Sequence, residues 1–583
     1  MDAITRFRLL AGAARPFLIG KLRDTMKRPF AMRQARSRVP TTASTLLGLN
    51  IGLRPLPSES WRETYGEDVL AFAQNVWKGA IEAYGIDSWQ IGDDLNMTEQ
   101  RGTLELARMH HWPAYALAAT LSEEPWRDRL VQEIDAFRDR YPAFTGPLWS
   151  VAMDSALRVH NMLLAVDWLM QIDAAFFESE QGHAFVRRVA AFAIDHALAI
   201  EAMLETAGGM ATSHLLGDLL GLIAVGAYVV GDDNIRQRGL WARERLVAEV
   251  NAQVLPDGMS FEASTGYHRH VVDIVIHALA LYRHDVDLVT GRNAGLMLQR
   301  QRQLESFGMP LIGDNDDGMA VKLRGFRPTT DFLYETTSLI DEVPRGVDTR
   351  FVGPLQHLSF EHFGLDLYRH SGFVLTARCG PIGQYGKGGH AHNDQNAITL
   401  TVNDEPVIVD PGSSWYSQVD ARNADRSVRS HATVVVDDEE QNLIPSGGGE
   451  SLWWLIGDRT KASVVDAHES SWEGVAGRHR RTIDIIDEEN AVLIVIHDRI
   501  DPQCRGVVTI PVGPNIHVEL HDGLAELVGM RSRCTLRWDR DNKGTIAHRA
   551  IRYSPRFAQP DVVDVLRITM SGSVITWTIT LPR

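Results

Sequence analysis

The chain has 583 residues, of which 44% are hydrophobic and 23% charged, values that exclude a disordered or fibrous protein. At about 150 residues per domain, this length predicts several domains or two large ones. The net charge of −16 argues against a general nucleic-acid binder, which would be basic overall. Three widely spaced cysteines offer neither a disulfide framework nor a paired-cysteine metal site, and no apolar run is long enough to span a membrane.

Residues 1–50 form a basic N-terminal extension. Within residues 1–40 there are ten basic side chains and two acidic ones. Arginines recur beyond the first residues, and no clean apolar segment with a cleavage site follows, so we expect no signal peptide. The extension could make a peripheral contact with anionic lipid head groups or polymer, or it could be a solvated arm.

From about residue 60 to 340 the apolar pattern is helical. Apolar side chains recur at three- and four-residue steps over 151–170, 215–230 and 271–282, which predicts three helices. Residues 103–113 have the same spacing, and this helix is predicted to end at Pro113. Glycine and proline separate the segments at irregular intervals, so we expect helical hairpins in series without a fixed repeat.

Beyond about residue 355 the pattern changes to the two-residue alternation of β-strands. Residues 397–402 alternate, residues 403–406 predict a turn, and residues 407–410 predict the partner strand. Further strands are predicted at 432–436, 491–496, 507–510 and 573–581.

Helices followed by strands predict an α+β multidomain protein with two separate cores. We expect a helical domain over 51–350 and an antiparallel β-sandwich domain over 351–583. Ligand-binding clefts are common at such junctions.

The first group of candidate site residues is Ser213 and His214, directly before an apolar run. Serine and threonine are preferred N-cap residues, which places His214 in the first turn of a helix. The positive end of the helix dipole disfavours imidazolium, so we expect a mostly neutral ring that donates or accepts. The alternative is a structural histidine near a helix cap.

The second candidate is Tyr267, which a loop rich in glycine, serine and threonine leads to the start of the helix 271–282. The helix N-terminus, Arg269 and the flanking histidines favour a phenolate. Tyr267 is therefore a candidate general acid or base. The alternative is a half-buried tyrosine that is hydrogen-bonded to its neighbours.

The third group begins with His390 and His392, where the strands start. An H-x-H pair on an extended chain directs both rings to one face and can offer two nitrogens to a metal. Asp410 and His431 could complete such a shell, and three or four nitrogen and oxygen ligands suit zinc. The alternative is a cluster of hydrogen-bonded loop histidines.

Basic side chains bracket this third group, namely Lys387, Arg422, Arg426 and Arg429. In a protein of negative net charge, a cationic lining would suit a polyanionic substrate, although ordinary surface charge is the alternative. The acidic segment 313–318 lacks the spacing of a calcium-binding EF-hand loop, so we interpret it as a turn near the cleft.

Together these segments resemble the heparinase II/III-like polysaccharide lyases, over roughly residues 70–550. The resemblance rests on Ser213-His-Leu-Leu-Gly-Asp, on Asp257-Gly-Met-Ser-Phe-Glu followed by Tyr267-His-Arg, and on Gly389-His-Ala-His-Asn-Asp with Val409-Asp-Pro-Gly-Ser-Ser-Trp-Tyr. It implies an incomplete (α/α) toroid followed by an antiparallel β-sandwich, with the active site between them.

The resemblance also implies a reaction, the β-elimination of a glycan that contains uronic acid. Tyr267 would be the acid and, in syn elimination, also the base, while His390 would be the base for anti elimination. His214 would help to neutralise the uronate carboxylate. His392, Asp410 and His431 would hold a structural zinc ion that braces the loop carrying His390.

Substrate contacts are expected from Ser213, Glu262, Arg269, Asn315 and Arg422. Family members commonly have asparagine where this chain has Ser213. A hydroxyl has a single proton, whereas an amide both donates and accepts. Neutralisation of the carboxylate could therefore depend on another group, such as Asn315.

Two other functions stay open at this point. One is a glycoside hydrolase that uses Glu262 with Asp314 or Asp316 as a carboxylate pair. The other is a non-catalytic factor that binds or assembles polysaccharide. In each case we expect an acidic polysaccharide as partner, no nucleic acid, and a cytoplasmic or non-classically exported bacterial protein.

Overall fold

The computed structural model describes residues 31, 47–78, 105–206, 211–282, 288–315, 318–325, 355–370, 372–416, 418–444, 463–466, 469–474, 477–556 and 560–583. Nearly all of the basic N-terminal extension therefore lies outside the described residues. The chain divides into two compact units. The first comprises Met1–Gln253, Arg269–Leu298 and Asp317–Gly346, and the second comprises Val254–His268, Gln299–Asp316 and Val347–Arg583.

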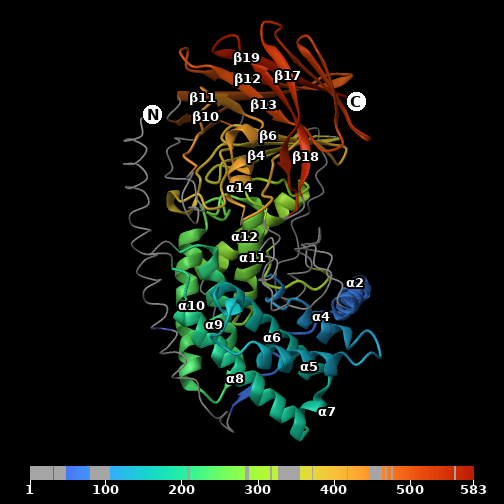
Figure 1. The fold of residues 1–583 in the computed structure, drawn as a ribbon, viewed down its shortest axis with the longest axis vertical. Helices are drawn as coiled ribbons and strands as arrows, with labels where there is room; N and C mark the ends of the chain where they lie inside the picture. The colour runs from blue at the N-terminus through green and yellow to red at the C-terminus, as the bar shows by residue number, and fades with distance from the viewer. Residues whose placement is uncertain are drawn as a thin grey trace. The chain divides into compact units, whose positions relative to one another are not determined.

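The first unit is helical (Figure 1). Its described helices are α2 (Glu59–Trp77), α4 (His111–Ala118), α5 (Trp126–Arg140), α6 (Ala152–Ile172), α7 (Ala174–Phe177), α8 (Glu180–Ala202), α9 (Ser213–Tyr228) and α10 (Asp233–Gln253), with parts of α11 (Thr265–Ala280) and α12 (Leu288–Ser306). The central helix is α6, which packs against α4, α8 and α9 and is buried along nearly its whole length. A helix that is buried all round needs apolar side chains on every face, as α6 has.

The predicted helices over 151–170, 215–230 and 271–282 correspond to α6, α9 and α11, although α11 begins earlier, at Thr265. The prediction that a helix ends at Pro113 is wrong. Pro113 lies in the first turn of α4, which begins at His111. Proline is tolerated there because the first backbone N–H groups of a helix have no partner within it.

The described residues of the second unit form three antiparallel sheets. The first is an eight-stranded sheet of β14 (His517–His521), β15 (Leu524–Val528), β16 (Arg533–Trp538), β19 (Val574–Pro582), β12 (Ala491–Ile500), β11 (Gly477–Asp487), β10 (Glu469–Gly474) and β9 (Ser463–Asp466). The second is a five-stranded sheet of β3 (Leu355–Phe360), β4 (Leu365–His370), β5 (Phe373–Arg378), β6 (Ala397–Val402) and β7 (Glu405–Ile408). The third is a four-stranded sheet of β17 (Lys543–Tyr553), β18 (Asp561–Thr569), β13 (Gly506–Pro511) and β8 (Val434–Val436).

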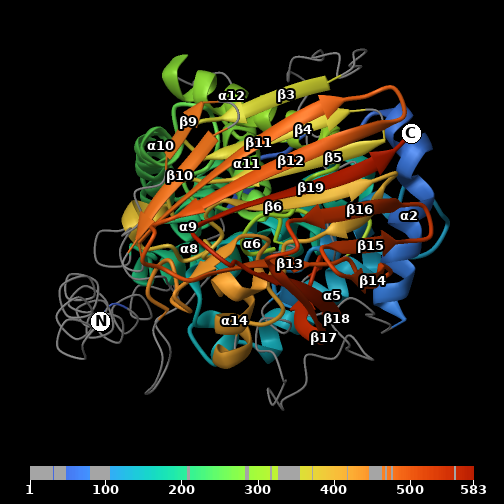
Figure 2. The ribbon, with the colours of Figure 1, turned by 90° about the horizontal axis from the view of Figure 1, so that it is seen from above.

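Figure 2 shows the eight-stranded sheet lying over the five-stranded one. One continuous apolar core includes side chains from all three sheets, such as Leu400 of β6, Ile494 of β12 and Ile568 of β18. Because side chains alternate between the two faces of a strand, β4 contributes Tyr368 to this core and Leu367 to another.

That other core lies on the opposite face of the five-stranded sheet. There Leu365 and Leu367 pack with Met259, Phe307 and Ile312. These partners come from Val254–His268 and Gln299–Asp316, which the sequence analysis assigned to the helical domain over 51–350. The strands of the second unit begin at Leu355, near the predicted border. The two earlier segments nevertheless belong to the second unit, because their apolar side chains pack against its sheet.

The predicted hairpin after residue 396 forms with a shorter turn than expected. Strands β6 and β7 are joined by Asn403 and Asp404 alone, both at positive φ, and β7 begins at Glu405. Asparagine and aspartate tolerate this left-handed conformation, which a two-residue hairpin turn requires. Pro406 fits within β7 because this strand lies at the edge of its sheet, next to a register shift.

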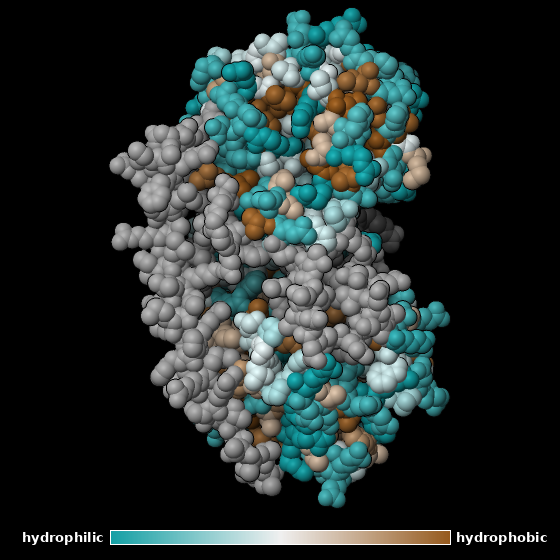
Figure 3. Space-filling model, viewed as in Figure 1, coloured by the Kyte–Doolittle hydropathy of each residue, from teal (hydrophilic) through white to brown (hydrophobic). Residues whose placement is uncertain are grey.

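The described surface of the second unit is mainly hydrophilic on the face shown in Figure 3, with small separate hydrophobic groups. Its exposed large hydrophobic side chains include Val562 and Val574, and exposed residues of this kind occur singly on most proteins. Among the helices that the structure describes, none is both long and apolar enough to cross a bilayer.

Candidate active site and metal site

Tyr267 lies in the first turn of α11, where the preceding loop fixes it. The hydroxyl of Ser264 accepts from the backbone N–H of Tyr267 (3.1 Å) and donates to the carbonyl of Asp314 (2.6 Å). This is the N-cap bond expected of serine at a helix start. Ala263, just before it, has a φ of 57°, a conformation that costs energy for any residue other than glycine and is often found at functional sites.

The ring of His390 stacks on the ring of Tyr267. The ring centroids are 3.4 Å apart and the planes differ by 12°, and only small fractions of both residues are exposed. The sequence predicted that Tyr267 and His390 belong to different domains. Instead both residues belong to the second unit, and their rings are in face-to-face contact.

Glu262 holds His390 in this orientation. Its fully buried carboxylate accepts from Nδ1 of His390 (2.7 Å), and the side-chain amide of Gln384 also donates to it. Since a carboxylate only accepts, Nδ1 of His390 carries a proton, and its Nε2 can keep a lone pair. The contacts of Glu262 thus face the histidine, whereas the sequence analysis predicted a substrate contact.

Two glycines allow this close packing. The side-chain oxygen of Gln384 accepts from the backbone N–H of Gly389 (2.8 Å), and a Cβ at Gly389 would come within 2.4 Å of that oxygen. A Cβ at Gly313, which has a φ of +71°, would lie 2.8 Å from the carbonyl oxygen of His390. Larger residues at these positions would therefore displace the loop that carries His390.

Asp314 is the centre of a second set of contacts. Its Oδ2 accepts from Tyr416 (3.0 Å) and from Nη2 of Arg422 (2.8 Å), and its Oδ1 lies 3.1 Å from Nε2 of His392. Burial by itself would raise the pKa of this carboxyl, but Arg422 and His392 outweigh it and hold the pKa below its usual range. Asp314 is therefore an ionised, buried carboxylate in a segment that the sequence suggested to be a turn or to supply one carboxylate of a hydrolase pair.

Arg422 is buried with its partners rather than lining an open surface. Besides Asp314, it donates to the carbonyl of Gly389 (2.6 Å), and its guanidinium lies 4.4 Å from the ring centroid of Tyr416. Arg429, also expected in a cationic lining, is paired with Asp438 and Glu440. Much of the predicted cationic lining is thus neutralised within the protein.

Asn315 also makes contacts inside the second unit. Its side-chain amide donates to the carbonyl of Pro555, and its backbone N–H lies 3.2 Å from the hydroxyl of Ser413. These bonds join the segment after Gly313 to two other loops, so at least one amide proton of Asn315 is already used.

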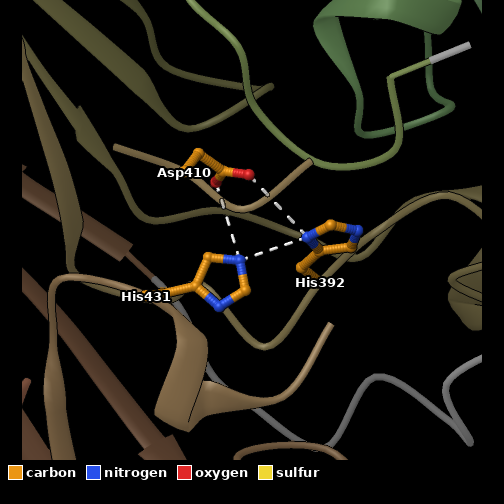
Figure 4. Close-up of side chains that lie close together, drawn as sticks. All are labelled: His392, Asp410 and His431. Atoms are coloured by element: carbon orange, nitrogen blue, oxygen red, sulfur yellow. Dashed lines mark hydrogen bonds and ion pairs between the residues drawn. The ribbon is translucent and has the colours of Figure 1, made fainter. Parts of the chain in front are cut away.

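His392, Asp410 and His431 form a compact group that could hold a metal ion (Figure 4). Nδ1 of His392 lies 3.1 Å from Nε2 of His431. Oδ1 of Asp410 lies 3.9 Å from Nδ1 of His392, and Oδ2 of Asp410 lies 3.6 Å from Nε2 of His431. All three side chains are buried, and one ligand atom from each lies within 4.8 Å of the others.

The outer ring nitrogen of each histidine has its own acceptor. Nδ1 of His431 donates to the carbonyl of Ser427 (2.8 Å), and Nε2 of His392 faces the carboxylate of Asp314. Such bonds orient each ring so that its inner nitrogen can offer a lone pair to a metal ion, as metal-binding histidines require. Burial, with a contribution from Asp394, raises the pKa of Asp410 to about 7 against the opposing effect of His392, and a cation would favour the ionised form.

The remaining predicted residues, Ser213, His214 and Arg269, belong to the first unit. Ser213 is the first residue of α9, and His214 lies in its first turn, as predicted. Nδ1 of His214 makes a short hydrogen bond to the carboxylate of Glu205 (2.5 Å). Arg269 lies in α11, partly buried.

Sequence reasoning missed the roles of Gln384, Glu205 and Asp314 in holding these side chains. Gln384 is in a glycine-rich loop and Glu205 precedes α9, so neither has a spacing that predicts its partner. Asp314 gave a weak signal, because acidic residues next to glycine are common in turns.

Two family models match the chain. Residues 83–289 match the heparinase II/III N-terminus, and residues 353–578 match the heparinase II/III-like C-terminal model. No curated protein has a significantly similar sequence.

Solved structures share the fold. One is a heparinase III with a TM-score of 0.64 and 13% identity, covering 94% of this chain and 88% of that one. Another heparinase III has a TM-score of 0.57 and 15% identity, covering 91% and 85%. A heparan sulfate lyase from Pedobacter heparinus has a TM-score of 0.53 and 14% identity, covering 96% and 88%.

These matches confirm the predicted fold class, a helical toroid followed by an antiparallel β-sandwich. Together the two family models cover all the segments on which the sequence resemblance rests. The chain therefore belongs to the heparinase II/III-like family of polysaccharide lyases.

Proposed function

We propose that this protein cleaves an acidic glycan containing uronic acid by β-elimination. The observation that carries the proposal is the stacked pair of Tyr267 and His390, a phenol beside an imidazole whose Nδ1 is held by a buried carboxylate. Such a pair supplies one proton donor and one proton acceptor within a single sugar ring's reach. The heparinase III and heparan sulfate lyase structures named above, which share the fold, agree with a glycan of this class.

In this reaction Nε2 of His390 takes the proton from C5 of the uronate. The C4–O4 bond breaks as the C4–C5 double bond forms, and the departing oxygen takes a proton from the hydroxyl of Tyr267. Both proton transfers are complete, so the enzyme needs no other co-reactant. The two groups return to their starting states when His390 releases its proton and Tyr267 regains one.

The uronate carboxylate must also be neutralised, because its negative charge makes the C5 proton less acidic. We assign this task to His214, with Ser213 beside it. Arg269 is a further candidate contact for the substrate. Each assignment is tested by an alanine substitution that should raise KM and lower kcat for the same polymer.

The same proposal includes a structural zinc ion held by His392, Asp410 and His431. The donor set of two histidines and a carboxylate suits zinc, and both histidines already have outer acceptors. The ion would brace the loop that carries His390, which is two residues from His392. Elemental analysis of purified protein should give about one zinc per chain.

The decisive experiment incubates the protein with a panel of uronate polymers and follows the ultraviolet absorbance of the unsaturated product. Tyr267→Phe should reduce the rate by about 10²- to 10⁴-fold, the usual contribution of a general acid. New reducing ends without that absorbance would mean hydrolysis, and binding without turnover in both proteins would mean a non-catalytic factor.

A further inference from the structure

Tyr267 has a second phenol as its neighbour. Its hydroxyl oxygen lies 3.1 Å from the hydroxyl oxygen of Tyr416, and the Tyr416 hydroxyl lies 3.0 Å from Oδ2 of Asp314. Tyr416 is buried, with 8% of its surface exposed, in the loop that follows β7. The three side chains form a short hydrogen-bonded row that ends on a carboxylate.

The carboxylate fixes the direction of the protons in this row. Oδ2 of Asp314 also accepts from Nη2 of Arg422, a group that can only donate, so this oxygen acts as an acceptor. Tyr416 has a single proton, which it therefore donates to Asp314. Its oxygen then faces Tyr267 with a lone pair, so the hydroxyl of Tyr267 must be the donor in the bond between the phenols.

We propose that Tyr416, oriented by Asp314, is a positioning residue that keeps Tyr267 protonated in the resting enzyme. A phenolate at Tyr267 would face the lone pair of Tyr416 unless Tyr416 gave up its bond to Asp314. This differs from the phenolate that the sequence pattern predicted. The catalytic consequence rests on the proposed function, because only a neutral phenol can give a proton to the departing O4.

Other groups that face Tyr267 also influence its ionisation. The Arg422 guanidinium favours the phenolate by its charge, and the ring of His390 covers one face of the phenol. Glu262, behind His390, and Asp314, behind Tyr416, carry negative charge that favours the neutral form. Tyr416 and Asp314 are the part of this set that acts through a directed hydrogen bond.

The row also gives Tyr416 a task after proton transfer. Once Tyr267 has given its proton to O4, the Tyr416 hydroxyl can rotate away from Asp314 and donate to the new phenolate. This rotation gives up the charge-assisted bond to Asp314, so it follows proton transfer and does not favour the phenolate beforehand. Tyr267 can then regain its proton and Tyr416 return to Asp314.

The test measures the ionisation of Tyr267 without any substrate. For each protein, the alkaline ultraviolet titration of tyrosinate is compared with that of the same protein carrying Tyr267→Phe, and the difference reports Tyr267. In Tyr416→Phe the midpoint should fall by about 0.5 to 1 pH unit, because the neutral phenol loses its acceptor. In Asp314→Asn it should fall further, since a negative charge is lost and Tyr416 is free to donate to the phenolate.

The matched control is Tyr385→Phe, an exposed tyrosine of the same unit, which should leave the midpoint where it is in the parent. An unchanged midpoint in both Tyr416→Phe and Asp314→Asn would overturn the proposal, as would an equal shift in the control. If Tyr416→Phe does not fold, Asp314→Asn decides the question alone.

Steady-state kinetics then separate this proposal from the proposed function. If Tyr416→Phe lowers kcat with little change in KM, both hold. If no polymer is cleaved by the parent but the midpoint shifts as expected, the lyase function fails while the pairing of the two phenols stands. If the parent cleaves a polymer but the variants do not shift the midpoint, the lyase function stands and the pairing of the two phenols fails.

Discussion

Two histidines, His390 and His392, are separated by one residue but are placed in different chemical surroundings. Each has one ring nitrogen at a buried carboxylate, Glu262 for the first and Asp314 for the second. His390 is held through Nδ1 and lies against Tyr267, whereas His392 is held through Nε2 and turns Nδ1 toward Asp410 and His431. The position of each carboxylate therefore determines which ring nitrogen of the histidine remains available for other groups.

The largest effect that tests whether His390 and His392 have separate roles is expected from removing the imidazole of His390. His390→Ala should lower kcat by about 10²- to 10⁴-fold, as expected for loss of a general base. The metal content of this variant should equal that of the parent, because the His390 ring contacts Tyr267 and Glu262 and is not a proposed metal ligand. Product absorbance and elemental analysis measure the two effects.

His517→Ala is the matched control, since this side chain is largely exposed on β14 of the same unit. Loss of zinc in His390→Ala would show that the two regions are not separate.

Removing the carboxylate that holds His390 should have a smaller effect. Glu262→Gln should lower kcat by about 10- to 100-fold with little change in KM, the usual cost when a histidine loses its orienting partner. A complete loss of activity would instead favour a hydrolase in which Glu262 itself reacts.

On the other side of the comparison, His431→Ala should remove the zinc and lower the thermal unfolding midpoint by several degrees. Activity should fall only in part, because His431 acts through the loop and not on the sugar. The exposed His548→Ala provides the control. Full zinc occupancy in His431→Ala would exclude the metal site as proposed.

The smallest effect concerns a buried histidine that has no such carboxylate. His160, in the first unit, has no hydrogen-bond partner for either ring nitrogen among the described residues. Burial, with the nearby His277 and Arg54, lowers its pKa well below the usual value. The unfolded chain therefore binds this proton more readily than the folded one. Stability is full above the unfolded pKa of about 6.5 and decreases below it.

His160→Gln should reduce the pH dependence of the free energy of unfolding by up to about 1.4 kcal/mol per pH unit, the value for one proton. Chemical unfolding of parent and variant at several pH values from about 5 to about 7.5, a range that includes the histidine pKa, measures this dependence. An unchanged slope would mean that His160 is already protonated or solvated in the folded protein.

The order of helices and strands was predictable because it follows from local periodicity, as for α6, α9 and β12. Tyr267 and the histidines were recognisable because their residue types are rare on packing faces. The roles of Asp314 and Glu262 were not predictable, because they depend on which distant loops meet. The same is true of Pro113, whose effect depends on whether it begins or ends a helix.

Tyr267 and Tyr416 are 149 positions apart in the chain, yet both belong to the second unit. During synthesis Tyr267 would leave the ribosome long before its partners His390 and Tyr416 exist. A C-terminal fragment starting at residue 351 would also lack Tyr267, Glu262 and Asp314, so it could bind metal without having the reacting pair. Attempts to split this protein at the border between helices and strands should therefore give two inactive halves, and complementation would require residues 254–268 and 299–316 to dock onto the sheet.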